Sequence, residues 1–269
     1  SGLIRYWMGI AQKTFLRIEQ TIIEECRTKF RSMSQLLTIP LFVLPSAIFP
    51  SVSETLRVFE PRYKQMLDDC TIDEKQFGYI AQNPEIDSID GWPQPSSFGV
   101  LCSIDDMWER GTNIIFTANA NQRFELLEVV HSALPSIPFG DIYPTVDDLV
   151  DQYIEESPQG KLYLRATIRL LDDLEGECSS EDWSSFLHDW AHQIVDVNSI
   201  FGSMDIDFEQ VLSILEKEFL VCDSSSLWQV AHAILDNQDD RQSALSSSSF
   251  DEVFSILRQT IPEKNTQLN

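Results

Sequence analysis

Basic residues are scarce in this sequence: 19 Lys and Arg stand against 43 Asp and Glu, which gives a formal net charge of −24. Affinity for nucleic acid depends largely on Lys and Arg side chains that displace counterions from phosphates. An anionic membrane surface repels an acidic protein for the same reason. We therefore expect a protein partner and no nucleic acid.

Cysteine is also scarce, and its pattern excludes two classes of small stabilised domain. The five cysteines are odd in number, far apart and form no C-x-x-C pair: Cys26, Cys70, Cys102, Cys178 and Cys222. This argues against a disulfide scaffold and against a zinc ribbon. No apolar run of about 18 residues and no secretory signal is present. We expect an intracellular, reducing compartment: the cytoplasm, or an organelle stroma or matrix if Ser1 follows a cleaved targeting peptide.

Motifs for catalysis are missing as well. Gly160-Lys161 is the only Gly-Lys pair, and it lacks both the upstream glycine and the following Ser or Thr of a nucleotide-binding P-loop. His188 and His192 lie at i, i+4, a spacing at which a helix can bind zinc, with Asp189 beside them as a possible base. The sequence signals no third ligand, so whether these histidines bind metal stays open. We assign no catalytic residue, no metal and no cofactor, and we do not expect an enzyme.

The chain does carry a basic amphipathic segment at its start. Apolar residues recur at helical spacing over residues 3–31, where six basic and three acidic residues give +3. This predicts an N-terminal amphipathic helix over 1–34. It packs on the body of the protein, or it anchors the chain to a partner or a membrane surface, which is the one membrane contact that we consider.

From residue 37 the apolar period changes from helical to extended. The sequence predicts strands at 37–44, 55–59, 77–81, 98–104, 113–118, 123–130 and 161–170, with turns at 110–113 and 119–121. A helix begins at Pro61, since proline suits a first helical turn. Many short strands at this spacing indicate a closed or nearly closed β-barrel.

An acidic insertion and a helical region complete the chain. The insertion, residues 131–160, contains a predicted short helix at 146–154. After about residue 178 we expect four short helices in a small bundle, with N-caps such as Asp207 and the capping-box pair Ser249 and Glu252. Acidic pairs such as Asp105-Asp106 are interpreted as solvated turns.

Several short motifs in this order resemble the Lon protease N-terminal (substrate-binding) domain family. They include Phe59-Glu60-Pro61-Arg62-Tyr63 and Gly99-Val100-Leu101. The signature residues are Pro40, Phe42, Pro50, Phe59, Glu60, Pro61, Arg62, Tyr63, Gly78, Gly99, Arg123 and Phe124. We expect their roles to be structural, with Glu60 and Arg62 capping the helix start and tying it to the barrel.

The resemblance implies an α+β fold with a PUA-like β-barrel at 35–175 and a helical subdomain at 176–269. It also implies a stand-alone member without ATPase or protease domains. Its role would be non-enzymatic binding of client polypeptides or a dedicated partner, linked to proteolysis or quality control. The alternative is an accessory subunit of a larger complex, docked through the N-terminal helix and the acidic insertion.

Aromatic residues in loops are the predicted partner-binding residues. Loops carry binding residues, and tryptophan is enriched at binding hot spots. Trp92 follows a glycine in a Pro-bearing loop, Trp108 stands in a predicted acidic turn, and Phe139 and Tyr143 lie in the insertion. The alternative for the two tryptophans is that they cover the barrel ends.

Overall fold

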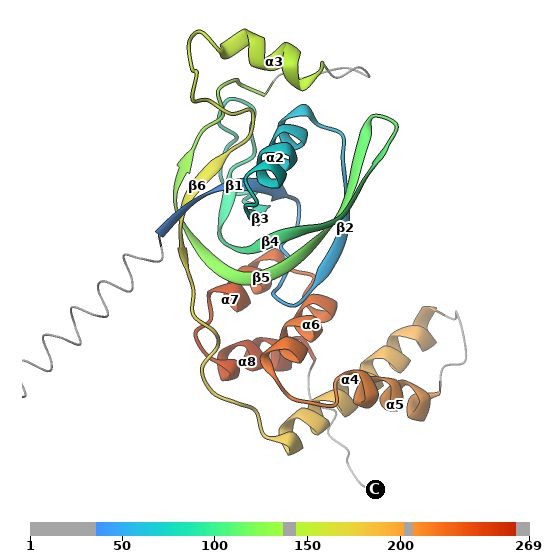
Figure 1. Cartoon of the computed structure of the whole chain (residues 1–269). Coiled ribbons are helices and arrows are strands. Elements are labelled where there is room, and N and C mark those ends of the chain that lie inside the picture. The colour runs from blue at the N-terminus through green and yellow to red at the C-terminus, as the bar shows by residue number, and fades with distance from the viewer. Residues whose placement is uncertain (1–35, 137–143, 202–206, 262–269) are drawn as a thin grey trace, which may run out of the picture. The chain divides into compact units, whose positions relative to one another are not determined.

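The computed structural model describes residues 36–136, 144–201 and 207–261, and this part of the chain contains six strands and seven helices (Figure 1). The strands are β1 (Leu36–Leu44), β2 (Ser53–Val58), β3 (Phe77–Gln82), β4 (Pro95–Arg110), β5 (Asn113–Val130) and β6 (Arg165–Leu170). The helices are α2 (Pro61–Ile72), α3 (Val146–Tyr153), α4 (Ser180–Phe201), α5 (Phe208–Glu218), α6 (Ser224–Ile234), α7 (Gln238–Ser246) and α8 (Phe250–Thr260). The α+β class is confirmed. The predicted N-terminal helix, 1–34, lies outside the described residues.

The strands form one sheet in the order β2-β5-β4-β3-β1-β6, and β6 pairs in addition with β5. β1 and β3 run parallel, whereas β2 with β5, β3 with β4, β4 with β5 and β5 with β6 run antiparallel. Because β5 is paired at both of its ends, the sheet curls back on itself and leaves β2 outside the ring. The predicted barrel is confirmed in outline, although it is not closed cleanly.

Two strand predictions need correction. Residues 113–130 form one strand, and the predicted turn at 119–121 is wrong: Asn119 and Ala120 pair with β4, where the register shifts between Leu101 and Cys102. The strand predicted at 161–170 begins only at Arg165. Before it, the N–H of Leu162 donates to the Gln65 side-chain carbonyl of α2, 2.7 Å away, and the carbonyl oxygen of Leu164 accepts a single bond of 2.8 Å from the N–H of Leu41 on β1.

Helix α2 begins at Pro61, as predicted, and its buried face is formed by Tyr63, Met66 and Leu67. The Tyr63 hydroxyl donates to the carbonyl oxygen of Val43 on β1 at 3.0 Å, which fixes the helix to the barrel. Glu60 makes no side-chain cap bond, contrary to expectation. Its carboxylate pairs instead with Arg62, Oε2 to Nε at 2.8 Å.

The helices after β6 share one hydrophobic core with the barrel. The ring of Phe49 stacks on Trp228 of α6 with centroids 5.5 Å apart. Five helices, α4 to α8, are described after β6, where four were predicted. The additional one is α7, which is largely polar and whose Gln242 side chain bonds to both the N–H and the carbonyl of Phe98, each at 3.0 Å. α7 thereby holds the helical part to β4.

The acidic insertion contains the predicted helix. α3 begins with a capping box between Thr145 and Asp148 and buries Leu149 and Tyr153 against Leu162. In the described part of the chain no helix combines the length and the apolarity needed to span a membrane.

Candidate functional site

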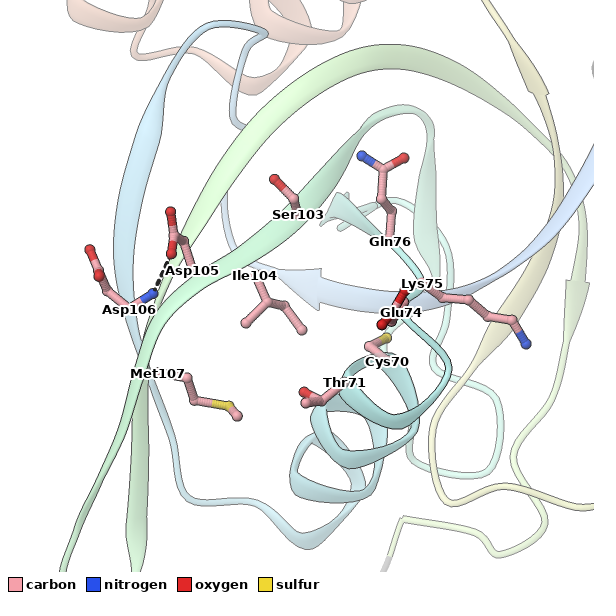
Figure 2. Close-up of a pocket in the computed structure, with 10 residues that line it drawn as sticks. All are labelled: Cys70, Thr71, Glu74, Lys75, Gln76, Ser103, Ile104, Asp105, Asp106 and Met107. Carbon is pink, nitrogen blue, oxygen red and sulfur yellow. Dashed lines mark hydrogen bonds between the residues drawn. The ribbon is translucent and has the colours of Figure 1, made fainter.

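An open groove lies between helix α2 and the half of β4 that leads to the β4–β5 hairpin (Figure 2). Its volume is about 430 Å³, which is within the usual range of ligand pockets. The lining residues are Cys70, Thr71, Glu74, Lys75 and Gln76 from α2 and the turn after it, and Ser103, Ile104, Asp105, Asp106 and Met107 from β4. Figure 2 shows Ile104 and Met107 directed toward α2, so the part of the β4 wall that faces α2 is apolar.

A β-bulge in β4 places Met107 in this wall. Asp105 pairs with Thr117 and Trp108 with Ile115, so Asp106 and Met107 together oppose the single residue Phe116. In a regular strand Ile104 and Met107 would point to opposite faces, because side chains alternate. The extra residue returns Met107 to the face of Ile104, which is a known effect of bulges.

The backbone of the bulge is held in an uncommon conformation. Asp106 has φ = 44°, a left-handed value that Asp and Asn tolerate better than most residues. Its N–H donates to the side-chain Oδ1 of Asp105 at 2.9 Å. The pair Asp105-Asp106 is therefore part of a strand, and the solvated turn predicted from the sequence is wrong.

Carboxylates lie on both walls of the groove. Glu74 lines it from the end of α2, and Asp105 and Asp106 line it from the bulge, with side chains directed away from α2 in Figure 2. Beyond Met107 on β4, Glu109 pairs with Ile114. Its negative charge acts on the carboxyl group of Asp68 on α2. Partial burial raises the pKa of Asp68, and the negative charges of Asp69 and Glu109 raise it further.

One cation, Lys75, lines the groove, and it is already engaged. Its Nζ lies 2.8 Å from Asp73 Oδ2. In the described part of the chain no ion pair involves Glu74, Asp105 or Asp106, which line the groove, or Asp68 and Glu109, which stand beyond its lining on α2 and β4. The groove is therefore an apolar surface with an uncompensated negative rim.

The groove is suited to binding and not to nucleophilic chemistry. Burial raises the pKa of the Cys70 thiol to about 12, and only thiolates are effective nucleophiles. The Thr71 hydroxyl donates back to the carbonyl oxygen of Leu67 at 2.8 Å. No histidine lines the groove among its described residues.

Two of the four predicted partner-binding residues, Trp92 and Trp108, lie in the described part of the chain, and their surroundings differ. The Arg62 guanidinium lies over the ring of Trp92, 4.0 Å from its centroid, and the indole N–H donates to the Leu134 carbonyl at 3.1 Å. Trp92 thus ties its loop to α2 and to the start of the insertion. Phe139 and Tyr143 lie outside the described residues.

Trp108 stands on β4, not in a turn, and its side chain is 47% exposed. Because it pairs with Ile115, it shares the outer face of the sheet with that residue, opposite Met107. The sequence predicted Trp108 as a partner-binding residue and did not indicate Met107. The run Asp105-Asp106-Met107-Trp108 contains both, but the bulge that separates their faces has no clear local signal.

The histidine pair packs against an aromatic ring. His192 stacks on Phe208 with centroids 4.1 Å apart, and His188 lies edge-on to the same ring. Asp189, the possible base, is paired with Arg258 at 3.0 Å. Among residues 36–136, 144–201 and 207–261, no group of three or more His, Cys, Asp or Glu is arranged to hold a metal ion.

The curled sheet, the helix after its second strand and the helical region after β6 define a Lon N-terminal domain-like fold. A Lon N-terminal domain protein from Xanthomonas campestris shares it, with a TM-score of 0.52 and 17% identity over 82% of this chain and 97% of that one. The N-terminal domain of the Mycobacterium avium complex Lon protease gives a TM-score of 0.50 and 10% identity over 84% and 98%. At these identities the likeness concerns the fold alone.

The model of the ATP-dependent protease La (LON) substrate-binding domain matches residues 38–262, so the chain belongs to this family. The suspected resemblance is confirmed. Among curated protein sequences none matches the chain significantly. The Lon substrate-binding domain is itself non-catalytic, and a substrate-binding module implies polypeptide substrates or protein partners.

Proposed function

We propose that this chain is a non-enzymatic module that binds client polypeptides in the groove between α2 and β4. The observation that carries the proposal is the pair Ile104 and Met107, which the bulge in β4 presents on one wall of an open groove of about 430 Å³. Monomeric proteins rarely leave such apolar surface in a concave site without a use for it. Membership of a substrate-binding family agrees with this use.

We further propose that the captured segments are destined for proteolysis or quality control. The motivation is that the family and the solved relatives are named after Lon, an ATP-dependent protease. A physical link would be tested by adding the purified module to a candidate unfoldase or protease and measuring the degradation rate of a labelled client. An unchanged rate with every client that the module binds would contradict the link.

The groove is tested by fluorescence anisotropy with a short labelled peptide that carries one central leucine. Met107→Asn is expected to weaken binding by about tenfold, because a central apolar contact typically contributes more than 1 kcal/mol. Leu127→Asn is the matched control, since the exposed fractions are similar, 45% for Leu127 and 43% for Met107. Met107 opposes Phe116 near the start of β5, whereas Leu127 lies near the end of that strand. Equal binding by both variants, or no binding of any apolar peptide, would refute the groove as the client site.

The second candidate function is that of an accessory subunit docked in a larger complex. One observation favours it: α3 is anchored by its buried side and leaves Asp147, Asp151 and Ile154 exposed. Deleting residues 1–31, or replacing Ile154 by Asp, should then change the size of the native assembly on gel filtration. A monomer with unchanged partners after both changes would remove the support for docking.

A further inference from the structure

The two walls of the groove repel each other in the free protein. Partial burial, the charge of Asp69 and the charge of Glu109 on β4 together raise the pKa of Asp68 on α2, so Glu109 lies near enough to repel the Asp68 carboxylate. Glu109 and Met107 stand on the same face of β4, with Trp108 between them on the other face. The carboxylate of Glu109 is therefore presented on the α2 side, next to the apolar wall.

We propose that the clients of this groove are segments in which an apolar side chain is flanked by lysine or arginine residues. This inference rests on the proposed function and names its substrate class. A cation placed between Asp68 and Glu109 replaces a repulsion by two attractions, whereas an acidic segment adds a further repulsion. The net charge of −24 acts in the same direction at longer range.

The order of residues along the groove fixes the client pattern. On β4 the lining residues Ser103, Ile104 and Met107 are followed by Glu109, and on the other wall Asp68 of α2 precedes the lining residues Thr71 and Glu74. Figure 2 shows Ile104 and Met107 facing Thr71 and Cys70 across the groove. Asp68 and Glu74 lie on either side of these α2 residues, so the apolar centre has a carboxylate at each end.

The resident cation does not remove this preference. Lys75 and Asp73 are 64% and 51% exposed at the end of the helix and neutralise each other. The rim formed by Asp68, Glu74 and Glu109 keeps its charge. A client therefore meets an apolar surface bounded by acceptors that only a cation or a hydrogen-bond donor satisfies.

Three synthetic peptides of equal length test the inference by fluorescence anisotropy: one centred on Lys-Ala-Leu-Ala-Lys, one on Glu-Ala-Leu-Ala-Glu and one on Lys-Ala-Ser-Ala-Lys. The first is expected to bind at least about tenfold more tightly than the other two at low salt, and its advantage over the second should shrink as salt rises from about 0.05 to about 0.5 M. The double variant Asp68→Asn with Glu109→Gln should lose about tenfold for the two Lys-flanked peptides and should not weaken the Glu-flanked peptide.

The control is the double variant Asp147→Asn with Glu128→Gln, which makes the same change of net charge away from the groove and should bind all peptides as the parent does. The test variant removes a repulsion, so it should fold at least as stably, which urea unfolding checks. Equal binding of the Lys- and Glu-flanked leucine peptides would overturn the substrate class and leave the proposed function intact. If the serine peptide binds as tightly as the leucine peptide, the site is a cation site alone and both proposals fall. Both also fall if no peptide binds.

Discussion

The buried guanidinium of Arg123 on β5 donates a hydrogen bond of 3.0 Å from Nη1 to the carbonyl oxygen of Leu245 in the last turn of α7. The same group also donates to the carbonyl oxygens of Ser247 and Asp172. Arg241 on α7 repeats the arrangement, since it donates to His232 and Leu235 at the end of α6 and to Ala47 beside the barrel. Each arginine thus satisfies carbonyl groups that a helix C-terminus leaves without an intrahelical partner.

Replacing Arg123 by Met should destabilise the protein by about 3 kcal/mol. The change leaves three carbonyl groups short of a donor, of which those of Leu245 and Ser247 are buried. Hydrogen bonds to charged groups typically contribute about 1.5–3 kcal/mol each, in part offset by the apolar replacement. The free energy of unfolding, measured in urea, checks this. Arg169→Met is the control: Arg169 pairs with Glu125 at a partly exposed site, so its loss should cost less than about 1 kcal/mol.

Glycine is required at position 99 because the Phe124 ring and the Tyr79 carbonyl oxygen leave no room for a Cβ atom there. Gly99 pairs with Phe124, and a Cβ at this position would lie 2.6 Å from Phe124 Cζ and 2.7 Å from the Tyr79 carbonyl oxygen. Gly99→Ala should therefore destabilise the fold by about 1–3 kcal/mol through overpacking. Gly111 has φ = 64°, a value that Asn tolerates, and a Cβ added there would meet no atom within 4 Å. Gly111→Asn should therefore leave the melting temperature nearly unchanged. A similar loss in both variants would contradict this account.

Local signals predicted most elements because propensity and tertiary packing agree in them. Pro61 begins α2, Asp207 caps α5, and Ser249 caps α8. The extended period of the apolar residues predicted the strands, and the number and spacing of these strands indicated the barrel. The family resemblance then supplied the order in which such strands pair, which periodicity alone does not contain.

The remaining features depend on partners that are remote in the sequence. α7 has no apolar stripe: it buries Arg241, Ala244 and Leu245, and its role is to donate and accept hydrogen bonds at the barrel. The thiols of Cys178 and Cys222 lie within hydrogen-bonding reach of each other, although they are widely separated in the chain. The groove itself exists because Phe116 opposes two residues of β4, a pairing that no short window reveals.

The conformation of Asp106 offers a direct test of the bulge. A β-branched residue is strongly disfavoured at φ = 44°, so Asp106→Val should destabilise the protein by about 1–2 kcal/mol. Asp106→Gly fits the same backbone without strain and should stay within about 0.5 kcal/mol of the parent. If the valine variant is as stable as the glycine variant, the bulge is not held in this conformation in solution.

Alkaline pH should destabilise the fold through the buried thiol beneath the groove. Burial raises the pKa of Cys70 from 9.0 to about 12, so the folded state keeps a proton that the unfolded chain releases. The resulting stability is fully present below pH 9 and is lost as the pH rises from 9 toward 12, since stability falls wherever the unfolded state binds fewer protons. Urea midpoints measured from pH 7 to 11 should fall steeply above pH 9.

Cys70→Ala should lower the midpoint at pH 7 by opening a small cavity and should also flatten the decline by about one proton. An equally steep decline in the variant would show that folding does not raise the pKa of Cys70.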